Sequence, residues 1–439
     1  MALQQVPAFN MNAYASPWET VSTSEKPGVP SYLELAKSFL PLVGSTPLKE
    51  LFPDQTIKQP IVAIEQKFET TGTLFTPVKF GEPDQLLGIS QYTTQRRYVQ
   101  PLYLRGSHYI SWGDANIRIK DGTVNDFENP EAFVAKQIEK LVEAHNLTWD
   151  VYRGLTLLGG INYTDPRSGQ PINVSAQIPA HNFWSYNNTQ GYRGRNEANL
   201  FRGLVDYNTP QATTSGMPWT EPDAAIVSCI QKFAYWFKTT NKTKITAMYI
   251  HPDLKMIISE NNEIKLQTGG LIPRLGAKTG DKNVLISNTG GGYQIESDVL
   301  SANQVGSIGV GPDGIISLAG IPIRTVETWY RDPVDGVRKF LWPRNKVVFV
   351  SEAGPDGNYE APGRTQYCVS EESGGNPGLW MREQRDTPIP AAPGMYIQMG
   401  NAGLPYLLYP HRVAHMTIGT IQDINTRIGV LGDLQYGSL

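Results

Sequence analysis

One stretch of this sequence constrains the fold more than any other, because its apolar residues keep helical spacing over eight turns. Asn129 can cap a helix and Pro130 suits its first turn, while Gly159-Gly160 provides the stop. The pattern predicts a helix over about 130–158, roughly 40 Å long, which would serve as a spine for other elements. The residues expected in its buried stripe are Phe133, Ile138, Leu141, Val142, Trp149 and Leu155.

The composition indicates a chain with many turns and a surface partly covered by partners. The 439 residues include 42 glycines and 32 prolines, and charged residues make up 18%, below the usual value of about 25%. The formal net charge of -3, without basic runs, argues against a tight grip on nucleic-acid phosphates. The two cysteines exclude a disulfide scaffold and a thiolate zinc site, and no apolar run is long enough to span a membrane.

The first 31 residues show neither helical nor strand periodicity and are interrupted by four prolines. They do not have the basic start and apolar stretch of a signal peptide. We therefore expect an extended arm whose apolar side chains need another surface to lie on. The candidates for such contacts are Phe9, Tyr14 and Trp18.

Two strand-like runs, Ile61–Phe68 and Arg96–Leu104, flank a turn-rich stretch over 69–95. This arrangement predicts a projecting β-arm. A lone two-stranded ribbon is only marginally stable in water, so the arm is expected to pack on something else. Its arginines suit two-point contacts with the carboxylates of a neighbour. The candidates are Arg96, Arg97 and Arg105.

The second half of the chain predicts a mixture of helix and strands. Thr220-Glu221-Pro222-Asp223 matches a capping box and predicts the start of a helix. The stretch 326–342 contains Asp-Pro and Asp-Gly turn signals between apolar runs, which predicts a hairpin. Further strands are expected at Ile245–Ile250, Val284–Ser287, Ile315–Ile323, Val347–Val350, Tyr406–Leu408 and Val413–Ile418.

No catalytic, cofactor-binding or metal-binding residues are predicted. Residues 309–314 fit GxGxxG, but a strand-like run follows where a dinucleotide site needs a helix. Residues 270–279 lack the Gly-Lys pair of a phosphate-binding loop. His411 and His415 lie in an extended stretch, where four residues span about 13 Å, too far for one metal ion. The chain is therefore predicted not to be an enzyme.

The order of these elements resembles the major capsid proteins of tailed phages with the Hong Kong 97 capsid fold, in particular the branch of the phage lambda major head protein. Four stretches carry the resemblance: Leu48–Gln66, Gln137–Gly160 with its GLTLLGGINYT ending, Gly320–Cys368 and Gly403–Ile418. Gly320–Cys368 is the most specific, because a hairpin leads to a "P..KV.F" strand and then to a segment rich in Tyr, Gly and Arg.

The resemblance implies an α+β capsid fold with five parts. These are an N-terminal arm (1–65), an E-loop β-arm (66–112), a peripheral domain (113–189 and 351–420) carrying the spine helix, an axial domain (190–350) and a C-terminal tail (421–439). It also implies hexamers and pentamers of an icosahedral virion shell, assembled in the host cytoplasm around double-stranded DNA without sequence-specific binding. Implied partners are a separate scaffolding protein, a portal and a cement or decoration protein.

Two other classes remain open from the sequence. The first is another shell-forming protein, such as an encapsulin-like compartment or a virion decoration protein. The second is a β-rich hydrolase whose carboxylates come together only in the folded chain. Particle formation would distinguish the shell proteins from the hydrolase, and deletion of Thr70–Gln95 is expected to leave a folded subunit that no longer closes shells.

Overall fold

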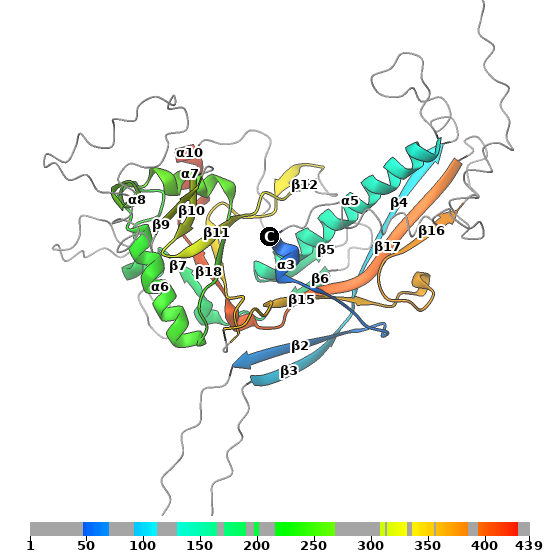
Figure 1. Ribbon diagram of the computed structural model, residues 1–439, viewed down its shortest axis with the longest axis horizontal. Coiled ribbons are helices and arrows are strands. Elements are labelled where there is room, and N and C mark those ends of the chain that lie inside the picture. The colour runs from blue at the N-terminus through cyan, green and yellow to red at the C-terminus, as the bar shows by residue number, and fades with distance from the viewer. Residues whose placement is uncertain are drawn as a thin grey trace, which may run out of the picture.

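The computed structural model describes most of the chain and has a mixed α/β fold (Figure 1). No helix in the part of the chain that it describes is long and apolar enough to cross a membrane. The described residues are 47–69, 92–111, 130–164, 171–189, 197–201, 216–267, 308–311, 314–331, 336–354, 357–384 and 394–428.

The first lobe is built on the long helix α5 (Pro130–Leu157), which lies along a five-stranded sheet (Figure 1). The 14-residue strand β17 (Gly394–Leu407) is the centre of that sheet. It pairs along one edge with β4 (Leu102–Ser111), and along the other with β15 (Gly363–Cys368) and β16 (Trp380–Gln384). The short strand β1 (Asp54–Thr56) adds in parallel to β15.

The second lobe contains a seven-stranded sheet in the order β7-β18-β14-β8-β11-β10-β9. Four helices belong to this part of the molecule: α6 (Ile226–Asn241), α7 (Pro252–Glu260), α8 (Asn262–Gln267) and α10 (Ile421–Ile428). The strands are β7 (Phe183–Ser185), β8 (Ala247–Ile250), β9 (Ile308–Gly311), β10 (Gly314–Leu318), β11 (Ile321–Thr325), β14 (Lys346–Val350) and β18 (Val413–Thr417).

Three two-stranded ribbons and several short helices complete the described fold. The ribbons are β2 (Val62–Glu69) with β3 (Tyr92–Val99), β5 (Gly160–Thr164) with β6 (Pro171–Ser175), and β12 (Trp329–Arg331) with β13 (Arg338–Phe340). The short helices are α3 (Pro47–Leu51), η1 (Ala180–Asn182), η3 (Glu197–Leu200), η4 (Glu371–Ser373) and η5 (Pro410–Arg412).

Strand β8 joins the two hydrophobic cores, because successive side chains of a strand point to opposite faces. Met248 and Ile250 lie in the core under α6, whereas Ala247 and Tyr249 lie in the core of the α5 lobe. Strand β14 alternates in the same way. The two lobes therefore share a wall of buried strands rather than a solvated linker.

The predicted spine helix is confirmed as α5, with one change in its buried stripe. Phe133, Ile138, Val142, Trp149 and Leu155 are buried, but Leu141 is only half-buried. In its middle turns the helix contacts the sheet along a narrow stripe centred on Ile138, Val142 and Trp149, and Leu141 lies at the margin. An aspartate that prevents folding is therefore expected at Ile138 or Val142, which are fully buried, rather than at Leu141.

The predicted start of the second helix at residues 220–223 is wrong. Helix α6 begins at Ile226, and its first amides are capped from another element: Glu263 of α8 accepts hydrogen bonds from the backbone N–H of Val227 at 2.7 Å and of Ser228 at 3.3 Å. A carboxylate at a helix N-terminus satisfies unpaired donors and complements the helix dipole. The capping-box pattern at residues 220–223 therefore does not mark the start of α6.

Other boundaries also differ from the expectations. The predicted strand over Arg96–Leu104 is split between β3 and β4 around Pro101, which cannot donate to a strand ladder. Strands β7 and β18 of the seven-stranded sheet lie outside the range 190–350, which the resemblance assigns to the axial domain. Residues 421–428 of the expected tail form α10, with Ile424 buried. Val284–Ser287 lies outside the described residues.

The hairpin between β10 and β11 turns at Ala319-Gly320, where both residues have positive φ, 51° and 73°. Alanine is strained there, whereas Asn-Gly is the preferred pair for such a turn. We expect Ala319→Asn to stabilise the protein by about 0.5 kcal/mol, seen as a higher urea midpoint. Ala319→Val, which adds a β-branched side chain at the same φ, should lower that midpoint; equal midpoints for both variants would contradict the argument.

Candidate assembly interface

The β2–β3 ribbon, at the bottom of Figure 1, is anchored to the body along one strand. Val62 and Ile64 of β2 are fully buried in the core of the α5 lobe. Gln66, which is also buried, donates from Nε2 to the carbonyl of Ala176 at 3.1 Å, and the N–H of Lys67 donates to the carbonyl of Leu408 at 2.7 Å. The ribbon is thus held in place by its own chain as far as residue 67.

The partner strand β3 presents Arg96 and Tyr98 outward, whereas Arg97 and Val99 are half-buried. Tyr98 is 67% exposed, which is unusual for so large a ring. Arg96 is exposed and forms an ion pair with Glu65, its cross-strand neighbour. Arg97 turns back and donates to the carbonyl of Ser175 at 2.5 Å, and burial lowers its pKa. This strand offers an aromatic and polar surface to a partner.

Some of the predicted contact residues lie in the described part of the chain, and others do not. Arg105 of β4 forms an ion pair with Glu372, so Arg96, Arg97 and Arg105 all have partners within the chain. These three arginines are therefore already engaged within the subunit, and their contacts with a neighbour's carboxylates stay a prediction. The other candidates, Phe9, Tyr14 and Trp18, lie outside the described residues.

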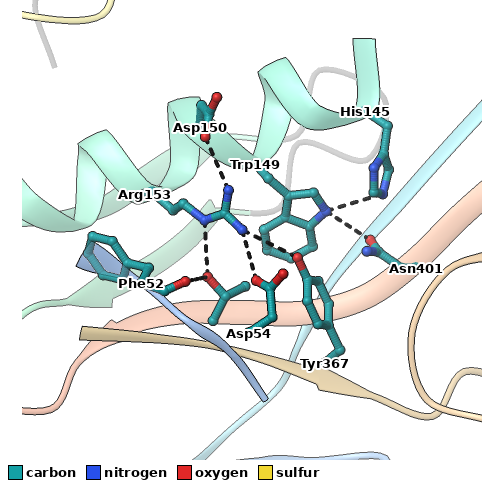
Figure 2. A network of polar contacts seen from close by, with 9 residues as sticks. Phe52, Asp54, His145, Trp149, Asp150, Arg153, Tyr367 and Asn401 are labelled. Atoms are coloured by element: carbon teal, nitrogen blue, oxygen red, sulfur yellow. Dashed lines mark hydrogen bonds and ion pairs between the residues drawn. The ribbon is translucent and has the colours of Figure 1, made fainter. Parts of the chain in front are cut away.

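A buried arginine fixes the segment that enters the fold before the ribbon (Figure 2). Arg153 of α5 donates from Nε to Thr365 Oγ1 at 3.1 Å and from Nη1 to Asp150 Oδ1 at 3.1 Å. Its Nη2 donates to Asp54 Oδ1 at 3.0 Å and lies 3.4 Å from the hydroxyl of Tyr367. One guanidinium thus joins β1, α5 and β15, which are far apart in the sequence.

The polar contacts continue one turn earlier on α5. The indole N–H of Trp149 lies 3.2 Å from both Asn401 Oδ1 of β17 and His145 Nε2 (Figure 2). Burial lowers the pKa of His145, so this ring is neutral at pH 7 and can accept from the indole. The helix is therefore bound to its sheet by directional contacts as well as by apolar packing.

The other end of the same segment reaches the second lobe. Glu50 of α3 lies 3.4 Å from Arg324 of β11, which also pairs with Glu352 at 3.1 Å and donates to the hydroxyl of Tyr249 at 2.9 Å. We call residues 47–57 the strap. Through Glu50 and Asp54 the strap is bound to both lobes.

The residues examined for enzymatic chemistry have structural roles in the described part of the chain. His415 Nε2 lies 2.8 Å from the carbonyl of Leu157 at the end of α5, and His411 is buried in η5. The GxGxxG stretch spans the paired strands β9 and β10, with no helix after it. Among the described residues no three His, Cys, Asp or Glu side chains gather as metal ligands.

Sequence reasoning missed the strap contacts, although one signal was available. Arg153 stands in the otherwise apolar stripe of the predicted helix, and a charged residue in such a stripe needs a buried partner. Its partners could not be read from the sequence, because Asp54 and Thr365 lie 99 and 212 residues away.

Comparison with known proteins gives structural similarity at low sequence identity. No family model and no curated protein matches the chain. A solved structure described as a prophage capsid protein from E. coli CFT073 is 14% identical, covers 88% of this chain and 97% of its own, and has a TM-score of 0.49. The capsid of cyanophage P-SCSP1u is 11% identical, with coverages of 86% and 89% and a TM-score of 0.42. The SrpI encapsulin of Synechococcus elongatus PCC 7942 is 9% identical, with 90% and 91% coverage and a TM-score of 0.40.

Proposed function

We propose that this chain is the major capsid protein of a tailed phage, a non-enzymatic subunit that assembles into the icosahedral shell enclosing a double-stranded DNA genome. Hexamers and pentamers of the chain would form the shell in the host cytoplasm, and a separate scaffolding protein, a portal and a cement protein are the expected partners. The α5 lobe would be the peripheral domain and the seven-stranded lobe the axial domain.

The observation that carries this proposal is the β2–β3 ribbon. One strand of the ribbon is anchored to the rest of the subunit, and the other strand presents Tyr98 to solvent. An arm that binds a neighbouring subunit would have this arrangement. Tyrosine and arginine are the residues that contribute most at protein interfaces. The order of strap, ribbon, long helix and returning strands also follows the order that the sequence resemblance implies.

Negative-stain microscopy with light scattering tests the class of protein directly. The full chain should be expressed alone and together with a candidate scaffolding protein. Closed shells, tubes or rings are the expected result. A small, monodisperse species in the presence of the scaffold would contradict the proposal. If shells form around protein cargo and never around DNA, the encapsulin-like alternative is favoured.

The ribbon register permits a sharper test than a simple deletion. Glu69 pairs with Tyr92 at the far end of the described ribbon, so replacing residues 70–91 with Asn-Gly should close it as a tight hairpin. We expect this variant to keep its far-ultraviolet circular dichroism and melting temperature but to lose closed shells. As a control, Tyr98→Phe keeps the ring and should still assemble. Normal shells from the shortened ribbon would show that residues 70–91 are not the intersubunit arm.

A further inference from the structure

Helix α6 carries a concentrated positive charge on a chain whose overall charge is slightly negative. Between Ala224 and Pro252 the sequence contains four lysines and no aspartate or glutamate. The lysines are Lys232, Lys238, Lys242 and Lys244, and all four are exposed. We call these residues, together with Tyr235, the α6 lysine face.

Lys232 and Lys238 lie on one side of α6 because the other side is committed to the core, and Lys242 and Lys244 follow directly after the helix ends at Asn241. Ile230, Phe233 and Phe237 of α6 are fully buried. Positions three and four apart lie on the same face of a helix, so Lys232 and Lys238 flank Tyr235, which is 74% exposed. From Lys232 to Lys242 this face is about 15 Å long.

No ion pair within the described residues neutralises this face. The two acidic residues that bracket it in the sequence are engaged elsewhere: Asp223 accepts from Asn262 at 2.7 Å, and Asp253 pairs with Arg344 at 2.6 Å. A solvated helix face usually interleaves both signs of charge at spacings of three and four residues. The α6 lysine face does not, and this favours a polyanionic partner.

We propose that the α6 lysine face binds the phosphate backbone of double-stranded DNA, without reading its sequence, and that α6 therefore lies on the inner side of the shell. Duplex DNA offers one negative charge per about 1.7 Å of its axis, so a 15 Å face meets several phosphates. Lysine supplies point charges rather than the two-point contacts that read bases, and exposed Tyr235 can pack on the sugar. The interior assignment, unlike the DNA binding, rests on the proposed function.

DNA binding by the full-length subunit can be measured before any shell forms. Fluorescence anisotropy with short duplexes of two unrelated sequences, between about 50 and 200 mM salt, should give equal affinities for both. If each lysine covers one phosphate, the plot of log K against log salt should have a slope of about -3.6. Lys232→Gln with Lys238→Gln should make that slope shallower by about 1.8. The control pair, Lys58→Gln with Lys140→Gln, removes the same charge from exposed sites elsewhere and should leave the slope unchanged.

Equal effects of the two pairs would overturn the proposal, because binding would then follow total charge. Tighter binding of polyglutamate than of the duplex would also overturn it and assign the face to an acidic protein segment. Neither outcome depends on shell formation, so they leave the proposed function standing.

The interior position has its own test, which uses the fact that both native cysteines, Cys229 and Cys368, are buried. Tyr235→Cys should react with a large maleimide-polyethylene glycol in free subunits and be protected in closed shells. Equal labelling of subunits and shells would place α6 outside. Failure of this variant and of the unmodified chain to form any shell would instead count against the proposed function.

Discussion

Replacing Arg153 with methionine is expected to lower the free energy of unfolding by about 3–5 kcal/mol. The arginine side chain is 4% exposed, and its guanidinium is the common partner of Asp150, Asp54 and Thr365. Methionine fills much of the same volume but removes the ion pair that Arg153 makes with the buried Asp150 carboxylate. An unpaired buried charge costs far more than the net value of the pair that it replaces.

Urea unfolding followed by tryptophan fluorescence and circular dichroism would measure this loss. Lys140→Met, on an exposed position of the same helix, is the matched control and should change stability by less than about 0.5 kcal/mol. Arg153→Lys keeps the charge but loses the planar fork, so an intermediate loss is expected. Adding Asp150→Asn to Arg153→Met should recover part of the stability, because the buried negative charge is then gone.

The same substitution should also release the strap. Asp54 is half-exposed and is bound through Arg153, while the Glu50 end of the strap is bound independently through Arg324. Limited proteolysis should therefore cut the Arg153→Met variant within residues 47–57 faster than it cuts the control. An Arg153→Met variant as stable and as resistant as Lys140→Met would show that the network in Figure 2 does not hold the strap.

The features that the sequence predicted well are those decided by residues that lie close together in the chain. Helix α5 has its capping residues, its apolar spacing and its terminating glycines within one stretch of chain, and strand β14 is a short apolar run that is buried. The turn signals of 326–342 likewise predicted the paired strands β12 and β13. In each case the residues that decide the structure are neighbours in sequence.

The errors arose where the deciding residue is distant. The start of α6 depends on Glu263, which caps it from 36 residues away. Leu141 has the right spacing for a core position, but its burial depends on how wide a strip of the sheet α5 covers. The pairing of Arg105 with Glu372 was likewise not predicted, because no local pattern relates the two residues.

The lysine face of α6 was missed for a different reason. The net charge of the whole chain averages over distance, and the chain has no continuous run of basic residues. Helical spacing separates Lys232 and Lys238 in the sequence but places them on one surface, and Lys242 and Lys244 follow after the end of the helix. The absence of acidic residues between Ala224 and Pro252 was the available signal.

Lowering the pH from 7 to 5 is expected to cost the folded chain about 4 kcal/mol through two buried histidines, about 2 kcal/mol each. Burial, with Arg344 nearby, lowers the pKa of His251 to about 3; burial, with Lys346 nearby, lowers that of His415 to about 4. In the unfolded chain both have a pKa of about 6.5. The unfolded state therefore binds protons first as the pH falls, and stability present above pH 6.5 is lost.

The surroundings of each ring explain why protonation is resisted. His251 accepts through Nδ1 from the N–H of Asp253 at the start of α7, an arrangement that requires the neutral ring. His415 of β18 lies against Phe183 and beside the carbonyl of Leu157. Burial also raises the pKa of Asp253, which acts in the opposite sense and offsets part of the loss. The substitution of a single histidine is therefore needed to separate the contribution of the histidines.

Urea unfolding at several pH values would test this directly. Two protons bound only by the unfolded state give a slope of about 2.7 kcal/mol per pH unit below pH 6, to which the lowered pKa of His145 adds in the same direction. His415→Gln should lower the slope by about 1.4 kcal/mol per pH unit. His108→Gln, at a half-buried position of β4, is the control and should keep the full slope. Because His415 connects β18 to the end of α5, its protonation should loosen the junction between the lobes before either core melts. A stability that stays level from pH 7 to 5, or an unaltered slope in His415→Gln, would show that these rings are not the groups that limit stability in acid.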